Sequence, residues 1–198
     1  IYLPDVTEDE AADGDLQEPA RFTAYFTPTY DGSEEKRGSF KYPIYGRPGS
    51  KSLKNRYTRQ EIDFAGALDG EGLELFYTKN RFDLYLLHVE GTGRVVTRRN
   101  GQRQDYYVTY AGENEMAWRW IARYMKDQGY IDNYSIDAQR RFLNRNPDKH
   151  EEIFSYCPSY VFFRVSDYPY GTDNIPLTDN RSIAMDNDYY RFKGNLAF

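Results

Sequence analysis

Cysteine and histidine are scarce in this sequence of 198 residues. A single cysteine, Cys157, excludes an internal disulfide and a cysteine-based metal site. The two histidines, His88 and His150, are too few for a zinc cluster. No run approaches the roughly 18 apolar positions of a membrane-spanning helix, and no hydrophobic core of a secretion signal is visible. The sequence indicates neither a metal nor a nucleotide cofactor, and we expect none.

Basic residues are absent from the first 18 positions, which hold seven of the 31 acids. The rest of the chain carries slightly more bases than acids and lacks the concentrated basic stripe of a nucleic-acid-binding protein. We interpret the short basic run at 97–103 as a solvated hairpin tip. Because the chain opens on Ile1 rather than Met, we expect a processed or trimmed terminus, from which an export signal or membrane anchor could have been removed.

Aromatic residues are abundant, with 20 Tyr and 12 Phe in a chain that is 39% hydrophobic. This composition indicates a globular protein with a sizeable core rather than a disordered segment. Tyrosine rings with one polar edge suit a groove that stacks on sugars or bases. They equally suit a small barrel whose rings close its core. Composition alone leaves both interpretations open.

The first half of the chain shows strand-like patterns around one short helix. Residues 21–28 alternate polar and apolar side chains with the two-residue period of a half-buried strand, which Pro28 ends. A second extended piece, at 40–45, contains a proline that favours an edge strand or an irregular strand. Thr58 and Glu61 have the spacing of a reciprocal capping box, so we expect a helix to begin there.

Residues 72–110 are predicted to be rich in β-structure. Asn100-Gly101 lies between two alternating segments and suits the two-residue loop of an antiparallel hairpin. On an extended strand, Leu84, His88 and Glu90 share one face. The apolar end of that strand would lie in the core, and Glu90 would emerge at the mouth of a barrel.

The helical period appears after residue 114. Apolar positions recur at helical spacing until Gly129, which is placed to end a helix. Ser135 is an expected N-cap of another helix, which must end near Pro147. Residues 159–165 then return to a strand pattern.

The stretch HVEGTGRV, residues 88–95, is either a binding turn or a plain hairpin. A phosphate cradle would need Gly-x-Gly-x-x-Gly between a strand and a helix, but Val96 stands where the third glycine belongs. A phosphate cradle is therefore rejected. The turn either presents Glu90 to a ligand or holds a satisfied His88 and a solvated carboxylate.

Seven segments in one order carry the most specific signal. They are FTAYFTPTYDGS, FKYPIYGRP, YTRQEIDFAGAL, LHVEGTGRV, YAGEN, PSYVFFRV and IPLTDNRSIAMD. Together they resemble, in order, segments of the MltA family of lytic transglycosylases of bacterial peptidoglycan. The resemblance covers roughly residues 21–186.

The resemblance implies a mainly β fold with short helices, in two domains. Residues 1–28 and 165–198 would form parts of a double-psi β-barrel, incomplete at the C-terminus here. Residues 29–164 would form an inserted smaller β-barrel domain with helices, and the groove would lie between the two.

The implied reaction is non-hydrolytic cleavage of the β-1,4 bond between N-acetylmuramic acid and N-acetylglucosamine. One carboxylic acid protonates the glycosidic oxygen. It then removes the proton from the muramyl C6 hydroxyl, which closes a 1,6-anhydro ring. One residue serves both steps because they are sequential and the nucleophile belongs to the substrate, unlike hydrolytic glycosidases with paired carboxylates.

Three positions depart from the family pattern. No residue matches the family's catalytic aspartate, which is expected downstream of this chain, and Asp186 resembles a supporting aspartate. Glu90 stands where the family usually has Gln, so it and Asp186 are the remaining candidate acids. Cys157 stands where Asn is usual, and we interpret it as a small buried hydrophobe.

The motif match also implies groove-lining residues, which are Thr27, Glu90, Thr92, Gly93, Tyr110, Gly112 and Asn114. Each has a structural alternative. Thr27 could bond its own backbone, Gly93 could sit in a turn with positive φ, and Asn114 could cap the following helix.

The resemblance implies peptidoglycan glycan strands as the partner, no nucleic acid, and a location in the periplasm or outer membrane of a Gram-negative bacterium. A further C-terminal segment or chain would complete the barrel. We expect residues 1–198 to bind peptidoglycan and to release almost no 1,6-anhydro products alone. The alternative is a catalytically inactive glycan-binding module of the same ancestry.

Overall fold

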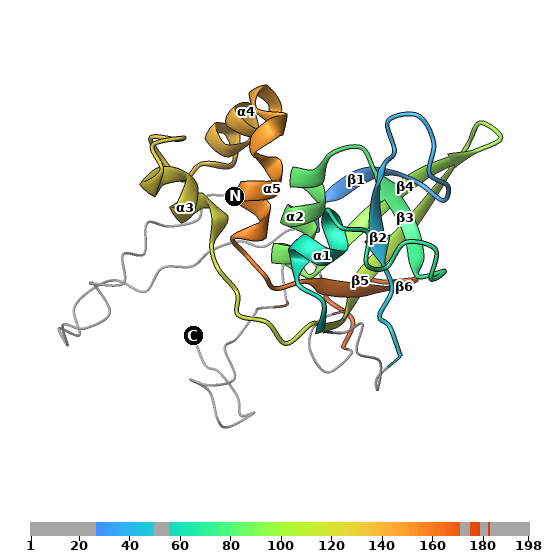
Figure 1. The fold of residues 1–198 in the computed structure, drawn as a ribbon. Helices are drawn as coiled ribbons and strands as arrows, with labels where there is room; N and C mark the ends of the chain where they lie inside the picture. Colours follow the sequence, from blue (N-terminus) through green and yellow to red (C-terminus); the bar gives the residue numbers. More distant parts are fainter. Residues whose placement is uncertain (1–26, 50–55, 171–174, 179–181, 183–198) are drawn as a thin grey trace, which may run out of the picture.

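A nearly closed barrel of six strands forms the centre of the molecule (Figure 1). The computed structural model describes residues 27–49, 56–170, 175–178 and 182. The strands are β1 (Thr29–Ser33), β2 (Tyr42–Tyr45), β3 (Glu74–Thr78), β4 (Thr92–Arg99), β5 (Gln102–Glu113) and β6 (Val161–Ser166). Their order in the sheet is β2-β3-β1-β4-β5-β6. The expected fold class, mainly β with short helices, is confirmed.

The barrel closes where its first and last strands in the sheet order meet. A parallel bridge joins Gly46, just after β2, to Phe163 of β6. Pro43 lies in β2, which stands at one end of the sheet order and pairs irregularly with β3 between Ile44 and Tyr45, so the expected edge or irregular strand is confirmed. β1 pairs parallel with β4 and antiparallel with β3, which ties the two halves of the barrel together.

In the described part of the chain, five α-helices and the 3-10 helix η3 accompany the sheet. They are α1 (Arg59–Asp63), α2 (Arg81–Glu90), α3 (Ile121–Asp127), α4 (Ile136–Arg145), η3 (Pro147–Lys149) and α5 (His150–Ser155). Figure 1 shows α3, α4 and α5 gathered on one side of the barrel, away from the β4–β5 hairpin tip. Within the described parts of the chain, no helix is both long and apolar enough to cross a membrane.

The strand predicted ahead of Glu90 is wrong, because residues Arg81–Glu90 form α2. The Asn80 side chain caps this helix by accepting hydrogen bonds from the backbone N–H groups of Phe82 and Asp83. Gly91 ends it in the left-handed conformation, at φ 68°. Half of the α2 residues are buried. Its apolar residues therefore follow one another in the sequence with few polar residues between them. That run shows no clear helical period.

Local capping and turn signals were predicted correctly at three places. Thr58 and Glu61 form the reciprocal capping box of α1. Asn100 and Gly101 both have positive φ, at 51° and 79°, as a two-residue hairpin loop requires. The Ser135 hydroxyl accepts a hydrogen bond from the Ala138 backbone and caps α4.

The helix expected from residue 114 begins later. It starts at Ile121, and Gly129 follows its end with φ 71°. Residues 114–120 run without helix or strand. Trp120 occupies the N-cap position and makes no capping hydrogen bond there. Instead its ring stacks on Tyr134, with the ring centroids 4.8 Å apart.

Three apolar clusters form the core of the described residues. One fills the barrel and includes Ile44, Val95 and Val108; another packs α2 against the C-terminal helices; the third joins α1 to β6. Cys157 is fully buried in the second cluster, which confirms its interpretation as a small hydrophobe.

Several predictions fall outside the described residues. These are the acidic positions 1–18, the strand pattern at 21–26, and Asp186. Most of the expected double-psi barrel, at 1–28 and 165–198, also lies there. The proposed domain boundaries therefore stay predictions.

Candidate functional site

Four of the expected groove residues come together at one end of the barrel. Glu90 ends α2, and Thr92 begins β4 two residues later. Thr92 pairs with Thr109 of β5, which places Tyr110 beside the Glu90–Thr92 turn. A side-chain carbon added at Gly91 would lie 4.0 Å from the Tyr110 Cβ atom. These contacts bring the turn and β5 onto one surface.

Thr27 reaches the same surface from the start of β1. The backbone N–H of Arg94 donates to the carbonyl of Pro28, at 2.8 Å. The parallel register pairs Thr29 with Arg94, and the same register continued backward would pair Thr27 with Thr92. We call Thr27, Glu90, Thr92 and Tyr110 the polar ledge. Three of these side chains are half-buried, and Tyr110 is 49% exposed.

Glu90 has an environment that disfavours its charge. It is half-buried, and burial raises the pKa of its carboxyl group above the usual value. It also ends a helix, where the aligned peptide dipoles repel a negative charge. Among the described residues, none forms a hydrogen bond or ion pair with it. Its neutral form can donate a hydrogen bond to a sugar oxygen.

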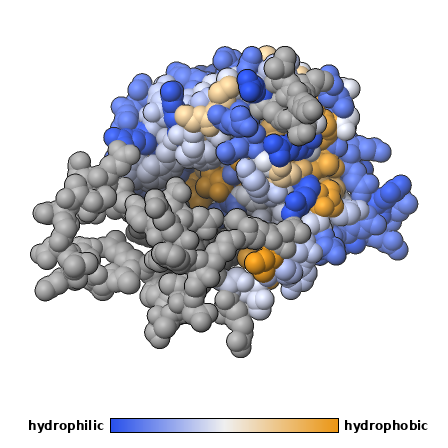
Figure 2. All heavy atoms as spheres, turned by 90° about the horizontal axis from the view of Figure 1, so that it is seen from below, coloured by the Kyte–Doolittle hydropathy of each residue, from blue (hydrophilic) through white to orange (hydrophobic). Residues whose placement is uncertain are grey.

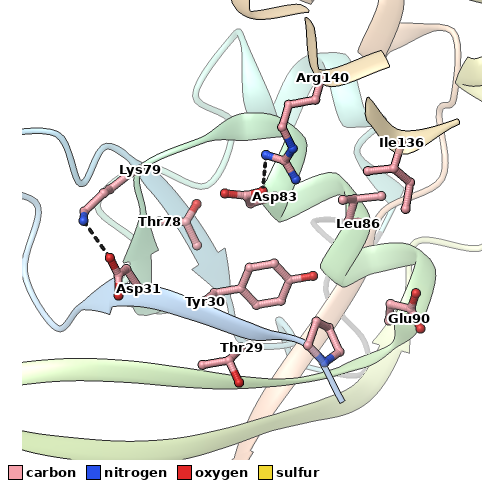
Figure 3. A pocket seen from close by; sticks show the side chains of 11 residues that line it. Thr29, Tyr30, Asp31, Thr78, Lys79, Asp83, Leu86, Glu90, Ile136 and Arg140 are labelled. Carbon is pink, nitrogen blue, oxygen red and sulfur yellow. Dashed lines mark hydrogen bonds and ion pairs between the residues drawn. The ribbon is translucent and has the colours of Figure 1, made fainter. Parts of the chain in front are cut away.

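A cavity of about 510 Å³ opens beside Glu90 (Figure 3). It lies between β1, α2 and α4, and its lining residues are Pro28, Thr29, Tyr30, Asp31, Thr78, Lys79, Asp83, Leu86, Glu90, Ile136 and Arg140. Two ion pairs join lining residues, Arg140 to Asp83 at 2.7 Å and Lys79 to Asp31 at 2.8 Å. Its other charged lining group is Glu90.

Tyr30 closes the floor of this cavity. Figure 3 shows its ring lying between β1 and α2, with the hydroxyl directed toward the Glu90 end. Burial, followed by the nearby charges of Asp83 and Glu90, raises the pKa of the Tyr30 hydroxyl. The hydroxyl therefore stays protonated and can donate a hydrogen bond. Tyr30 was not among the predicted site residues, because the strand predicted in this segment ends at Pro28.

Gly93 faces the core rather than the groove. Its φ is not positive, so the predicted alternative of a positive-φ turn is wrong, and Gly91 is the left-handed residue instead. A side-chain carbon at Gly93 would lie 2.6 Å from Leu87 Cδ1 and 3.1 Å from Tyr30 Cε2. The glycine lets α2 and Tyr30 pack closely on β4.

Asn114 is fully buried, and its side-chain amide forms hydrogen bonds within the protein. Its Nδ2 group donates to the carbonyls of Tyr57 and Pro158, at 2.8 and 2.9 Å. Its Oδ1 accepts from the backbone N–H of Tyr160, at 2.8 Å. It caps no helix, so that alternative is wrong. It fastens the end of β5 to the neighbouring segments.

Gly112 lies on β5, beyond Tyr110, at an irregularity in the pairing with β6. Its φ of 140° is rarely adopted by other residues. The side chain of Arg47 crosses directly over it. Arg47 was not among the predicted site residues, because nothing in its local sequence distinguishes it from other surface arginines.

His88 lies below the polar ledge and is buried. The predicted alternative of a satisfied histidine is wrong, since neither ring nitrogen has a hydrogen-bond partner among the described residues. Its ring meets the Tyr160 ring edge-on, with centroids 4.4 Å apart. Burial, and secondarily the charge of Arg59, lowers its pKa well below the usual value. Buried His88 is therefore neutral.

The surface around the site combines apolar and polar areas. Viewed from below, the molecule shows apolar patches between polar ones (Figure 2). Large hydrophobic side chains that are exposed in the described part of the chain are Val89, Tyr110, Trp118, Val165, Tyr168 and Ile175. No group of three or more His, Cys, Asp or Glu residues within the described ranges is arranged to hold a metal ion.

Comparison with known sequences gives consistent matches. The family model for the MltA specific insert domain matches residues 21–164. The chain is 35% identical over 178 residues to membrane-bound lytic murein transglycosylase A of Vibrio cholerae, covering 87% of this chain and 47% of that protein. The protein of the same name from Escherichia coli K12 is 30% identical over 171 residues, covering 84% and 45%. The chain spans about half the length of these curated relatives.

Solved structures agree with these sequence matches. The crystal structure of Escherichia coli MltA with bound chitohexaose has a TM-score of 0.75 and 29% identity, over 85% of this chain and 50% of that chain. The lytic transglycosylase LtgG of Burkholderia pseudomallei has a TM-score of 0.67 and 30% identity, over 84% and 50%.

Proposed function

Because this chain belongs to the MltA family, we propose that it acts in peptidoglycan lytic transglycosylation by binding the glycan strand along the polar ledge. The main support for this proposal is that several expected groove residues lie close together in the fold. Thr27, the Glu90–Thr92 turn and Tyr110 are far apart in sequence, and they share one surface at one end of the barrel.

The ledge has the chemistry of a saccharide site. The exposed Tyr110 ring offers an apolar face for stacking on a sugar, with a hydroxyl for hydrogen bonding. Thr27 and Thr92 add hydroxyl groups that both donate and accept. Glu90 adds a carboxyl group whose raised pKa favours its neutral, donating form. The protonated Tyr30 hydroxyl adds a further donor inside the adjoining cavity.

Cleavage of the strand requires one carboxyl group that serves both proton transfers. It must lie within about 2.6–3.2 Å of the glycosidic oxygen, and then of the muramyl C6 hydroxyl. We propose that this general acid is not Glu90, because Glu90 occupies the family's glutamine position, where a binding role is expected. Glu90 would instead bind and orient the sugar.

Binding to purified sacculi tests the ledge. Tyr110→Ala should weaken co-sedimentation with sacculi by about three- to tenfold, because the loss of one stacking ring typically costs about 0.5–1.5 kcal/mol. Tyr168→Ala is the matched control, since Tyr168 has a similar exposure of 50% and lies outside the ledge. Equal binding of sacculi by Tyr110→Ala and Tyr168→Ala would contradict glycan binding along the polar ledge.

The alternative function is an inactive glycan-binding module. An assay of reaction products distinguishes it from a lytic transglycosylase. Mass spectrometry of sacculi digested with residues 1–198 would detect 1,6-anhydromuropeptides. We expect binding with almost no release, and restored release when a segment bearing the family's aspartate is supplied. Abundant release by residues 1–198 alone would instead make Glu90 the first residue to substitute.

The proposed location is the periplasm or the outer membrane of a Gram-negative bacterium. It is supported by the names and sources of the relatives, which are membrane-bound enzymes of Vibrio cholerae and Escherichia coli.

A further inference from the structure

Arg47 lies across β5 because Gly112 has no side chain. A carbon added at Gly112 would be 2.7 Å from Arg47 Nε and 2.8 Å from Cζ, which is closer than any tolerated contact. The barrel seam fixes the start of the Arg47 segment, since the preceding residue, Gly46, bridges to Phe163. The guanidinium group is therefore held against the sheet rather than extended freely into solvent.

Among the described residues, most donors of this guanidinium group have no hydrogen-bond partner. Arg47 Nη1 donates one long hydrogen bond, of 3.3 Å, to the carbonyl of Ala111. Of the carboxylates in the described ranges, none lies within ion-pair distance of Arg47. A guanidinium group carries five N–H donors in a planar fork that matches the two oxygens of a carboxylate. Its partial immobilisation lowers the entropy cost of binding.

Arg47 and Tyr110 belong to one continuous surface. Tyr110 and Gly112 lie two residues apart on β5, which is roughly 7 Å along a strand. Burial raises the pKa of the Tyr110 hydroxyl, Glu113 raises it further, and the Arg47 charge opposes this shift. The guanidinium group thus acts electrostatically on the exposed ring of the polar ledge.

We propose that Arg47 forms a carboxylate-binding subsite next to the polar ledge, which makes the site prefer glycan strands that carry carboxylates over neutral ones. This inference rests on the proposed function, because the sugar on Tyr110 brings the carboxylate to Arg47. Two carboxylates have this chemistry: the lactyl group of muramic acid on a strand without peptides, and the carboxylates of the stem peptides on an intact strand.

Glu113 is the charged neighbour that opposes this subsite. It is exposed on β5, one residue after Gly112, and its charge repels an incoming carboxylate. Glu113→Gln should therefore strengthen binding of carboxylate-bearing strands while leaving binding of a neutral chain unchanged. Salt should weaken only the carboxylate-dependent part, because exposed charges are screened over about 10 Å at 0.1 M ionic strength.

The experiment compares three probes on residues 1–198: chitohexaose, which is neutral; glycan strands stripped of peptides by an amidase; and intact strands with stem peptides. Arg47→Gln should lower affinity for a carboxylate-bearing strand by about three- to tenfold, as expected for a charge-assisted hydrogen bond at a surface. It should change chitohexaose binding by less than about twofold. Arg47→Lys should retain part of the preference, because it keeps the charge and loses the planar fork.

Two further variants control this comparison. Arg98→Gln removes an equally charged, exposed side chain at the far end of β4 and should have no effect. Gly112→Ala should reproduce the loss seen in Arg47→Gln, since the added carbon displaces the guanidinium group. A thermal melting curve of Gly112→Ala shows whether this variant folds. If it does not fold, the test rests on Arg47→Gln.

The pattern of binding separates the outcomes. A preference for stripped strands over chitohexaose that Arg47→Gln abolishes assigns the lactyl carboxylate, whereas a preference confined to intact strands assigns the stem peptides. Equal binding of all three probes, unchanged in Arg47→Gln, overturns the subsite and leaves the proposed function standing. Failure to bind any of the probes overturns both.

Discussion

At the scale of single residues, Glu90 shows what the sequence could and could not provide. The resemblance selected it as a groove residue, and the structure places it beside Tyr110 and an open cavity. Its burial and its position at the end of α2 could not be predicted, because the run before it was interpreted as a strand. Burial raises the pKa of its carboxyl group, and the end of a helix is an unfavourable place for a negative charge.

Glu90→Gln should stabilise the protein near neutral pH. An acid whose pKa is raised on folding stabilises the folded state fully below its unfolded pKa, and this stabilisation is lost as pH rises through the folded pKa. The amide removes that loss, so the variant should melt at a higher temperature than the parent at pH 7, and the difference should shrink by pH 4. Glycan binding at pH 7 should be preserved or strengthened. A lower melting temperature at pH 7 would show that the charged form makes favourable contacts.

His88 should make the fold sensitive to mild acid. Its pKa is lowered on folding, so below about pH 6.5 the unfolded chain takes up a proton that the folded chain excludes. Stability should then fall by about 1.4 kcal/mol per pH unit for this one proton. His88→Phe should lose this part of the pH dependence in urea unfolding between pH 6.5 and 5. His150→Gln is the control, and equal slopes in all three proteins would contradict the assignment.

At the scale of elements, signals carried by a few neighbouring residues were predicted and buried elements were not. The capping box at Thr58, the cap at Ser135 and the loop at Asn100-Gly101 are set by local hydrogen bonds or backbone angles, so the sequence shows them directly. α2 is buried on most sides, and β1 is a short strand that pairs with two distant partners. Their identity depends on tertiary contacts.

Substitutions at Asn80 test whether residues 81–90 form helix α2, where a strand had been predicted from the sequence. Its side chain accepts two backbone hydrogen bonds at the start of α2, at 2.8 and 3.3 Å. Asn80→Ala should lower the free energy of unfolding by about 1 kcal/mol, while Asn80→Asp should retain the cap. Urea unfolding measures both. A strand at residues 81–90 would make the two variants equivalent, so equal stability would contradict the helix.

At the scale of the whole molecule, the family resemblance supplied what periodicity could not. The ordered motifs predicted groove-lining residues in distant segments, and the structure brings the Glu90–Thr92 turn and Tyr110 together. That these residues line a groove stays a prediction. The closure of β2 against β6, the cavity under Tyr30 and the position of Arg47 depend on packing between segments far apart in sequence. No local pattern encodes those contacts.

Glycan binding along the polar ledge can be tested by an NMR titration of isotope-labelled protein with chitohexaose. We predict that the backbone amide signals of residues 90–94 and 109–112 shift together in a saturable manner, and that those of α3 to α5 away from the cavity stay unchanged. Shifts centred on the C-terminal helices, or a titration that Tyr110→Ala leaves unaltered, would contradict the account.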